Sequence, residues 1–590
     1  CRLRLPGAHP PRAAPVRRLW RVRRTTTHGG TAVQQTTIDG GACFWVDTGR
    51  PTLTARLLFR AGSADEPLHE SGWLHLLEHA VLHGRGGGTL HVNGFVSPLI
   101  TAFDAHGPAE AVAQHLTEVT AALHRLDPSR LKHERDVLRA EGDMRGGPSV
   151  RAFSWRYGAR GPGVIAMGEP GLGRAEWQRL QERAHSVFTR GNAALVLDGP
   201  VPEGMRLDLP EGELLPIPHA DECQQQLPAW YVDDSLVLSG VVGRSNGATI
   251  LPDLLERGLR MRLREEAAGS YAPWATYEPV DADRALVIAG ADASRALMPT
   301  LADQARQLVD QLAQGPDPAW LDDVKAMRRQ ATLDPYALVG TAMRAGHDHL
   351  RGLPVLTREE TLAELDATGV EDVQVLAQAF ASSLLIGLPG EAIAPTDIPR
   401  VTQPVERGAV FGRRFRRADW PATTHSLVVD DEDAHLLEGD QYTCFHADDV
   451  AGMLSWDDGG RHLITYDGWG LTVEPSHWRR GHRAVEALDA MVPAARQLPM
   501  PSRDPVEPPA LPHPVTRWWR AIRRPWSASA LATWATLLLL AALATFLTAG
   551  SPSVLSLIVI GYFFYAAWKR HGARTYRGRT NPSASSPPEG

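Results

Sequence analysis

Two histidines and a glutamate stand close together early in the chain, in the stretch GWLHLLEH at residues 72–79. On a helix, His75 and His79 project from adjacent turns about 40° apart, and Glu78 lies within about 100° of both. Two imidazoles and a carboxylate can therefore converge on one metal ion. A hydrolytic zinc site needs three protein ligands, an open position for water, and a carboxylate that takes a proton from that water. The helix offers two ligands and one base, so a third ligand must come from elsewhere.

The residues around this string decide how it is interpreted, because chance alone gives H-x-x-E-H in about one chain of this length in twenty. The order is that of the inverted zinc motif. With the upstream stretch AGSADEPLHES, the chain resembles the pitrilysin/insulinase family of zinc metallopeptidases. The residues that match the family signature are Gly62, Ser63, Glu66, Gly72, His75, Glu78 and His79. The resemblance implies that His75 and His79 are zinc ligands and that Glu78 is the general base.

The resemblance also implies a third zinc ligand on a later helix. The family has a glutamate ligand there, preceded seven residues earlier by a supporting glutamate, and HERDVLRAE supplies Glu134 and Glu141. Glu141 is then the ligand and Glu134 its support. Without the family, the same segment is typical of a solvated helix face. The interval from His79 to Glu141 is shorter than the family usually shows.

A substrate-binding strand is expected between these two helices, in NGFVSPLITAF at residues 93–103. The family has an Asn-Ala-x-Thr edge strand there, which accepts the substrate backbone as an added strand. Asn93 is kept, whereas Gly94 and Val96 replace the alanine and the threonine. The resemblance assigns substrate binding in this stretch to Asn93, Phe95 and Phe103.

The second half of the chain contains LREEAAGSY. Active family members have an arginine and, seven residues later, a tyrosine, which bind the substrate near the scissile carbonyl, and Arg264 and Tyr271 match that spacing. Both side chains can donate hydrogen bonds to an oxyanion. An isolated pair of this kind would more often be a surface arginine and a strand tyrosine.

Length and composition set the broad class. At 590 residues the chain should divide into three or four units. Its net charge of -7 gives no reason to expect a nucleic-acid partner. The cysteines, four in all, are widely spaced and form no CxxC pair, which suggests neither a thiolate zinc site nor a disulfide framework. This spacing favours a reducing compartment.

The order of patterns indicates an α+β protein with two related halves, each closing on a strand that ends in Gly and Pro. We expect two homologous pitrilysin-like domains, which form half a clamshell, followed by a small β-rich module and a membrane hairpin. The expected ranges are a basic disordered arm (1–30), a zinc-binding domain (31–215), a second peptidase-like domain (216–400), a β-rich, pleckstrin-homology-like module (401–495), a Pro-rich linker (496–525), two transmembrane helices (526–568) and a basic tail (569–590).

Two apolar runs near the end of the chain predict membrane spans. Residues 528–547 carry no charge over about 20 residues, enough to cross a bilayer core. Residues 554–568 form a shorter uncharged run, and basic residues flank the pair on both sides. By the positive-inside rule both flanks face the cytoplasm. We therefore expect a multi-pass protein of the cell membrane with its peptidase domains on the cytoplasmic side; a buried core hairpin is the alternative.

The resemblance implies a partner as well as a substrate. Family chambers are built from four homologous domains, and this chain provides two, so a homodimer would complete the chamber. The leading hypothesis is a membrane-anchored zinc endopeptidase that uses Zn²⁺ to cleave peptides or unfolded polypeptide segments. The alternatives are a catalytically inactive relative that serves as a binding or regulatory subunit, and a narrow protease that processes leader peptides.

Overall fold

The computed structural model describes residues 33–510 except 143–145, 225, 246, 267–271, 293–296, 335–336, 391–394 and 421–422, and also describes Thr536 and Leu540. The chain divides into two compact units. The first comprises Cys1–Pro404, Phe445–Thr472 and Asp489–Arg503, and the second comprises Val405–Cys444, Val473–Leu488 and Asp504–Gly590. The predicted zinc ligands all belong to the first unit.

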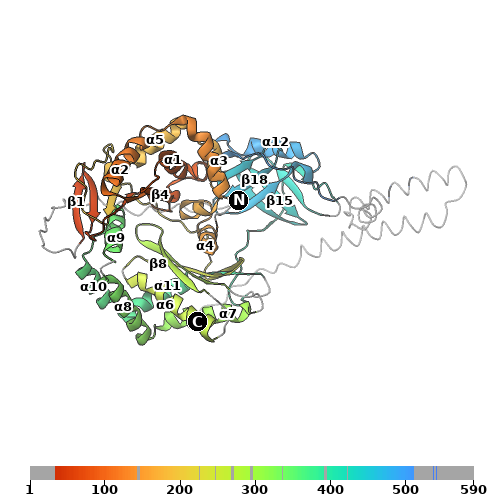
Figure 1. Ribbon diagram of the computed structural model, residues 1–590. Helices are drawn as coiled ribbons and strands as arrows, with labels where there is room; N and C mark the ends of the chain where they lie inside the picture. The colour runs from red at the N-terminus through yellow and green to blue at the C-terminus, as the bar shows by residue number, and fades with distance from the viewer. Residues whose placement is uncertain are drawn as a thin grey trace, which may run out of the picture. The chain divides into compact units, whose positions relative to one another are not determined.

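The first half of the first unit, within residues 31–215, is built on a six-stranded sheet in the order β1-β2-β6-β3-β5-β4 (Figure 1). The strands are β1 (Gln34–Ile38), β2 (Gly41–Trp45), β3 (Leu53–Phe59), β4 (His91–Val96), β5 (Thr101–Gly107) and β6 (Ala193–Leu197). β2 and β6 are parallel, and the other neighbours are antiparallel. β4 forms one edge of this sheet.

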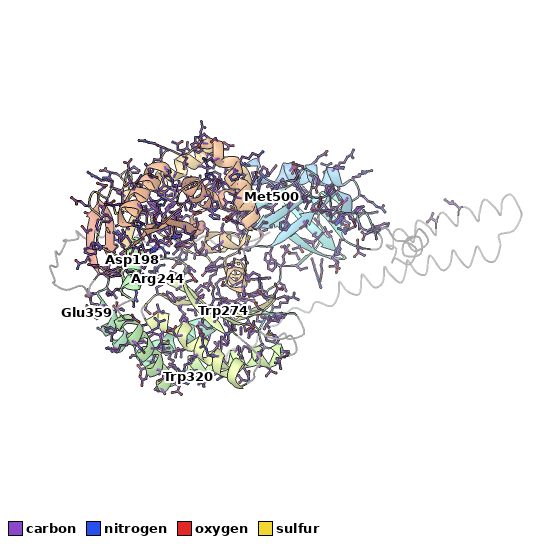
Figure 2. The ribbon with its side chains drawn as sticks, viewed as in Figure 1. Asp198, Arg244, Trp274, Trp320, Glu359 and Met500 are labelled. Atoms are coloured by element: carbon purple, nitrogen blue, oxygen red, sulfur yellow. The ribbon has the colours of Figure 1, made fainter. Side chains whose placement is uncertain are left out.

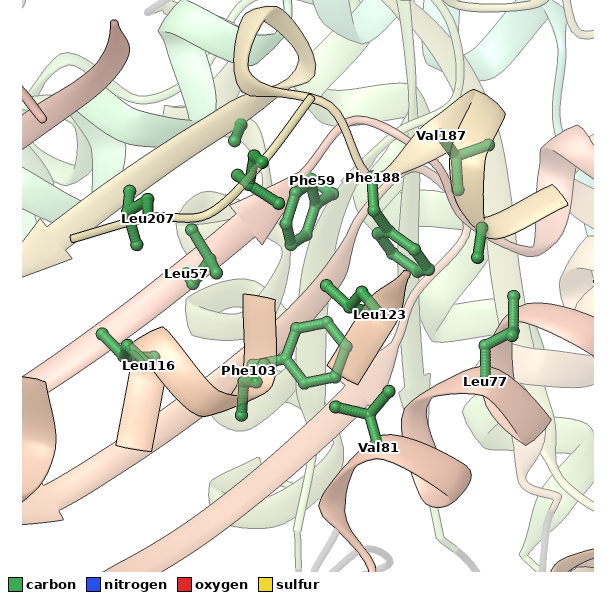
Figure 3. Close-up of a cluster of buried hydrophobic side chains, with 14 of the residues drawn as sticks. Leu57, Phe59, Leu77, Val81, Phe103, Leu116, Leu123, Val187, Phe188 and Leu207 are labelled. Carbon is green, nitrogen blue, oxygen red and sulfur yellow. The ribbon is translucent and has the colours of Figure 1, made fainter. Parts of the chain in front are cut away.

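Helices cover one face of this sheet, because alternate strand residues are apolar and need burial. The helices are α1 (Trp73–Leu82), α2 (Ala109–Leu123), α3 (Leu131–Gly142) and α5 (Trp177–Val187). Leu57 of β3 points into the core beneath them, whereas its neighbour Leu58 belongs to a second core on the opposite face. Figure 3 shows the helix-covered core, in which the ring of Phe59 packs edge-on against those of Phe103 and Phe188.

The second half, within residues 216–400, repeats this topology. Its sheet runs β7-β11-β8-β10-β9, with a parallel first pair followed by antiparallel pairs, as in β2-β6-β3-β5-β4. The strands are β7 (Ala229–Val232), β8 (Leu236–Gly243), β9 (Trp274–Pro279), β10 (Arg284–Ala291) and β11 (Leu385–Leu388). The covering helices are α6 (Ile250–Leu259), α7 (Met298–Gln314), α8 (Pro318–Leu333), α10 (Arg358–Ala367) and α11 (Val370–Ser382). The two sheets thus share this strand order.

Each half has one helix that packs against the sheet of the other half. α4 (Pro148–Tyr157) belongs to the first half but packs Ala152, Phe153 and Tyr157 against the second sheet. α9 (Leu338–Leu350) belongs to the second half but packs against the first sheet, where Gly346 leaves room for the side chain of Val196. This exchange buries apolar surface from both halves in shared cores, so it ties them together.

The region after residue 400 is rich in strands, but the structure divides it differently from a single 401–495 module. β17 (Val450–Ser455), β18 (Arg461–Thr465), β19 (Gly470–Val473) and β20 (Gln497–Pro499) form a four-stranded sheet. Most of this sheet belongs to the first unit, because Ala451, Ile464 and Leu498 share a core with Leu68 and Ala159. Residues 497–499 are thus a strand and not part of a linker.

The second unit contains a five-stranded sheet in the order β12-β16-β15-β14-β13. Its elements are β12 (Glu406–Arg407), β13 (Arg413–Arg416), β14 (Ser426–Val429), β15 (Asp433–Glu438), β16 (Gln441–His446) and most of α12 (Gly481–Met491). The last residues of β16 and of α12 are assigned to the first unit.

The predicted membrane spans at 528–547 and 554–568 lie outside the described residues, apart from Thr536 and Leu540. Within the described part of the chain, no helix is both long enough and apolar enough to cross a bilayer. The predicted arm at 1–30 and tail at 569–590 also lie outside the described residues.

Candidate active site

The beginning of α1 is fixed by a buried carboxylate. Glu66 is 3% exposed and accepts hydrogen bonds from the backbone N–H groups of Gly72, at 3.0 Å, and Leu74, at 2.7 Å. Burial raises the pKa of Glu66 to about 8, against these two amide hydrogen bonds, which lower it. The indole N–H of Trp73 donates to the carbonyl of Gly171 at 3.0 Å. Both contacts hold the first turn of α1 in place.

Two glycines of the sequence signature are required by packing. Gly72 adopts a left-handed conformation with φ of 85°, and a Cβ there would lie 2.7 Å from the Cβ of Glu169. A Cβ on Gly62 would lie 2.2 Å from the carbonyl oxygen of Ser97. Gly72 therefore lets the segment that carries Glu169 approach the start of α1.

The motif side chains lie on one side of α1. The apolar residues Leu74, Leu77 and Val81 lie on the other side, which packs into the core. The Oε2 atom of Glu78 lies 3.6 Å from Nε2 of His75 and 3.7 Å from Nε2 of His79. One ligand atom from each of the three residues falls within 4.8 Å of the others. Glu78 is 4% exposed, so its carboxylate has little contact with bulk water.

A carboxylate lies close to the Nδ1 atom of each imidazole. Nδ1 of His75 lies 3.0 Å from Oε1 of Glu169, and Nδ1 of His79 lies 3.5 Å from Oε2 of Glu134. Glu134 is buried and also contacts Nδ1 of His83. In metal sites a carboxylate behind the imidazole fixes its tautomer and orients the other ring nitrogen toward the ion. Both rings here have that arrangement.

Glu141 lies on the same face of α3 as Glu134, two turns later, as its spacing predicts. Its Oε1 atom is 3.6 Å from Nε2 of His79, and its side chain is 40% exposed. The structure therefore brings together all the residues to which the resemblance assigned metal binding, support and proton transfer.

The donor set fits a zinc ion by its chemistry, and one pair of its ligand atoms has a suitable spacing. Donors bound at about 2.0–2.1 Å in a tetrahedron lie about 3.3 Å apart, close to the 3.6 Å between His79 and Glu141. Burial, followed by the repulsion of His75, lowers the pKa of His79, which favours the neutral imidazole that a metal needs. Two imidazole nitrogens and a carboxylate are a ligand set of hydrolytic zinc sites.

The edge strand β4 passes directly over the motif. A Cβ on Gly94 would lie 2.2 Å from Oε1 of Glu78, so only glycine allows this approach. Asn93 is exposed on the same strand, and β4 has a paired neighbour, β5, on one side only among the described strands. Its other edge can accept an added strand. Phe95 is half-buried, with the guanidinium of Arg56 5.3 Å from its ring centroid.

The assignment of substrate binding to Phe103 is wrong. Phe103 lies on the inner strand β5 and is fully buried, with its ring between the sheet and the covering helices (Figure 3). It packs against Phe59 and Phe188 at ring-centroid distances of 6.1 and 6.0 Å. A side chain in this position contributes to the core and cannot reach a substrate.

The predicted oxyanion donors are only partly described. The backbone of Arg264 lies in a π-helical segment, Arg260–Glu266, that continues α6. The side chain of Arg264 and the whole of Tyr271 lie outside the described residues. Nothing in the structure therefore tests their roles.

The structure adds Glu169 to the predicted site residues. Its partner His75 is 94 residues away in sequence. The glutamate precedes a short 3-10 helix, Pro170–Arg174, with φ of 56°, so no helical or strand periodicity points to it. The one sequence signal is indirect, because Gly72 of the signature is the residue that leaves space for Glu169.

A cavity of about 1100 Å³ lies elsewhere, in the second half. It is lined by arginines of several elements, among them Arg244 (labelled in Figure 2), Arg344 and Arg351. None of the predicted zinc ligands lines it. The motif cluster and this cavity are therefore separate features.

Comparison with known proteins identifies the fold. No family model and no curated protein matches the chain. Among solved structures, a chain of complex III2 from Candida albicans with Inz-5 bound is similar at a TM-score of 0.50, with 14% identity over 60% of this chain and 95% of that chain. A peptidase M16 inactive domain from Pseudomonas fluorescens is similar at a TM-score of 0.50, with 16% identity over 60% of this chain and 97% of that chain. The chain thus has a mixed α/β fold that matches M16-like peptidase domains.

Proposed function

We propose that the protein is a zinc-dependent endopeptidase that cleaves peptides or unfolded polypeptide segments. The observation that carries the proposal is the pair of imidazoles on α1, each with a carboxylate at Nδ1 and with Nε2 near Glu78. A structural histidine pair has no need of such matched orientation. The M16-peptidase-like fold supports the proposal.

In this mechanism His75, His79 and Glu141 would hold the ion, while Glu134 and Glu169 would orient the imidazoles. Bound there, Zn²⁺ supplies Lewis acidity, which polarises a carbonyl and makes a water acidic enough to deprotonate near neutral pH. Glu78 accepts the proton of the attacking water and returns it to the leaving amine. Its near-complete burial keeps the carboxylate out of bulk water.

The substrate backbone would bind as a strand along β4, beside Asn93. Strand addition uses main-chain hydrogen bonds, so it selects extended conformation more than sequence. Arg264 and Tyr271 remain the proposed donors to the oxyanion. Because they belong to the second half, we propose that a homodimer places them at the partner's site. We also propose that 528–547 and 554–568 anchor the protein in the cell membrane, with the peptidase domains in the cytoplasm.

A second candidate function is that of an inactive relative that binds peptides or regulates another peptidase. The similar structure from Pseudomonas fluorescens favours it, because the same fold occurs there in a domain described as inactive. The retention of both histidines, Glu78 and Glu141 favours catalysis instead. A narrow protease that processes leader peptides would use the same chemistry on fewer substrates.

The test compares wild type with Glu78→Gln, by metal analysis of the purified full chain and by cleavage of an unfolded protein substrate. We expect Glu78→Gln to retain zinc and lose cleavage, since glutamine cannot accept the proton. Glu182→Gln is the matched control, because Glu182 is exposed on α5 and lies in no part of the proposed site. It should match wild type in both measurements.

The outcomes separate the candidate functions. Zinc bound by wild type without any cleavage would favour the inactive relative. Cleavage that persists in Glu78→Gln would contradict the role of Glu78 as base. A wild-type protein that binds no zinc and cleaves no peptide would contradict the proposal as a whole.

A further inference from the structure

The second unit brings together three side chains that could bind a metal. Asp433 and His435 stand two residues apart on β15, so both point to the same face of the sheet. β15 and β16 are joined by the two residues Gly439 and Asp440, and counting back from this turn places Cys444 opposite His435. One ligand atom from each of the three falls within 4.8 Å of the others.

The surroundings of His435 suit a bound ion. His435 is 8% exposed, and the ring of Tyr442 packs edge-on against it at 5.2 Å between centroids. Nε2 of His435 lies 3.9 Å from Oδ2 of Asp433, which is too long for a hydrogen bond but close to the separation of two donors on one ion. Among the described cysteines, Cys444 forms no disulfide.

We propose that Asp433, His435 and Cys444 are the ligands of a second metal site, in which the bound ion is Zn²⁺. A thiolate and an imidazole select zinc over magnesium or calcium, which prefer oxygen donors. Three protein donors leave the fourth position of a tetrahedral ion for a water molecule. The site lies within the second unit and does not depend on the proposed peptidase activity.

The sequence did not indicate this site, because the cysteine has no second cysteine near it and the three residues do not form a known spacing. Only the pairing of β15 with β16 places Cys444 beside His435. In a hairpin, the turn fixes the register between the two strands. A metal bound across it would therefore tie the two strands together at a point beyond the turn.

The experiment measures zinc content of the full chain in wild type, Cys444→Ser, His79→Ala and the double variant. We expect each single variant to bind one equivalent less than wild type and the double variant to bind none. If only the proposed peptidase site fails to bind, His79→Ala will match wild type and Cys444→Ser will still lose its equivalent. The two proposals therefore fail in distinguishable ways.

A second readout reports the sulfur ligand directly. After exchange of zinc for Co²⁺, a thiolate ligand gives a charge-transfer band in the near ultraviolet. We expect this band in wild type and in Cys223→Ser, whose thiol lies in the first unit beside the carbonyl of Arg156. The band should be absent from Cys444→Ser. His425→Gln, on a half-exposed histidine of the second unit, should leave the band unchanged.

The site is overturned if Co²⁺-loaded wild type shows no thiolate band, or if Cys444→Ser keeps the wild-type zinc content. Circular dichroism on each variant shows whether the sheet is intact. If Cys444→Ser proves unfolded, Asp433→Asn supplies the test instead, because it keeps the thiol and the side-chain volume. It should weaken zinc binding, and an unchanged affinity would contradict the proposal.

Discussion

The two halves of the first unit share one topology but place different residues on the helix that follows their central strand. In the first half this helix is α1, which has His75, Glu78 and His79 on the side away from the core. In the second half it is α6, which has only Asp253, Glu256 and Arg257 on the equivalent outward side. Asp253 and Arg257 form ion pairs with α8. The same scaffold thus presents the proposed metal-binding residues in one half and ion-pairing residues in the other.

The edge strands differ in the same way. β4 passes over α1 with Gly94 against the carboxylate of Glu78. β9, the corresponding strand of the second half, has the sequence WATYEP, without glycine. The comparison teaches that the site depends on local features that the fold does not impose. These are a polar side on the helix, close approach of the edge strand, and carboxylates behind the imidazoles.

The largest expected effect comes from removing a direct ligand on α1. His79→Ala should lose zinc and slow cleavage by more than about 100-fold. Losing an outer partner of a ligand costs up to about 100-fold, and losing the ligand itself should cost more. The matched change on α6 is Arg257→Ala, which removes an ion pair with Asp323 that is largely exposed. It should leave zinc and cleavage unchanged. Equal effects of the two changes would mean that the helices do not differ in function.

The contrast between the edge strands is tested by Gly94→Ala. The new methyl group would lie 2.2 Å from Glu78 Oε1, so the carboxylate must move. We expect bound zinc to remain and kcat to fall by about 100-fold, the cost of displacing a catalytic group by about 1 Å. Gly340→Ala is the control, because its Cβ on α9 meets nothing within 4 Å. If Gly94→Ala keeps full activity, the close approach of β4 has no catalytic role.

A smaller effect is expected from Glu169→Gln, which weakens the orientation of His75. Zinc affinity should fall by about 10-fold, since outer-shell partners typically contribute 10–100-fold. Excess zinc should restore cleavage, which separates this role from that of a ligand. Glu176→Gln, on an exposed residue of the same connection, should bind zinc as wild type does. Cleavage that stays low at saturating zinc would show that Glu169 does more than position the ring.

Much of this architecture could be predicted from the sequence, because its signals are local. The alternation in β3, the helical period of α2 and the repeated closing strands follow from side-chain periodicity. The motif residues of α1 are neighbours on one helix, so their convergence needs no tertiary information. Glu134 and Glu141 were assigned only through the family resemblance, since nothing in their own spacing distinguishes ligands from a solvated face.

The contacts that escaped prediction are those that depend on folding. Glu169 meets His75 across 94 residues of sequence, and Cys444 meets His435 only because two strands pair. Phe103 was misassigned because a phenylalanine near a substrate strand and one in the core have the same sequence pattern. The boundary near residue 400 also depends on long-range packing. Leu68 shares a core with residues of β17, β18 and β20, so these strands belong to the first unit.

The smallest expected effect concerns Glu66, whose buried carboxyl group accepts hydrogen bonds at the start of α1. On α6 the N-cap residue, Thr249, makes no side-chain capping hydrogen bond. The pKa of Glu66 is raised from 4.5 to about 8. The unfolded chain therefore releases this proton at lower pH than the folded one. Stability from this group is complete below pH 4.5 and declines as pH rises to about 8.

Thermal unfolding of the full chain with a chelator, from about pH 5 to about pH 8, measures this decline without interference from metal binding. Glu66→Gln should show a smaller loss of Tm over that interval, since glutamine does not ionise. At low pH it should also be less stable by about 1 kcal/mol, because its NH₂ group cannot accept one of the two amide hydrogen bonds that the carboxyl oxygens accept. Parallel pH profiles for the two proteins would mean that Glu66 is ionised when folded. In that case its amide partners and the positive charge of Arg183, which both lower the pKa of Glu66, would outweigh the cost of burial.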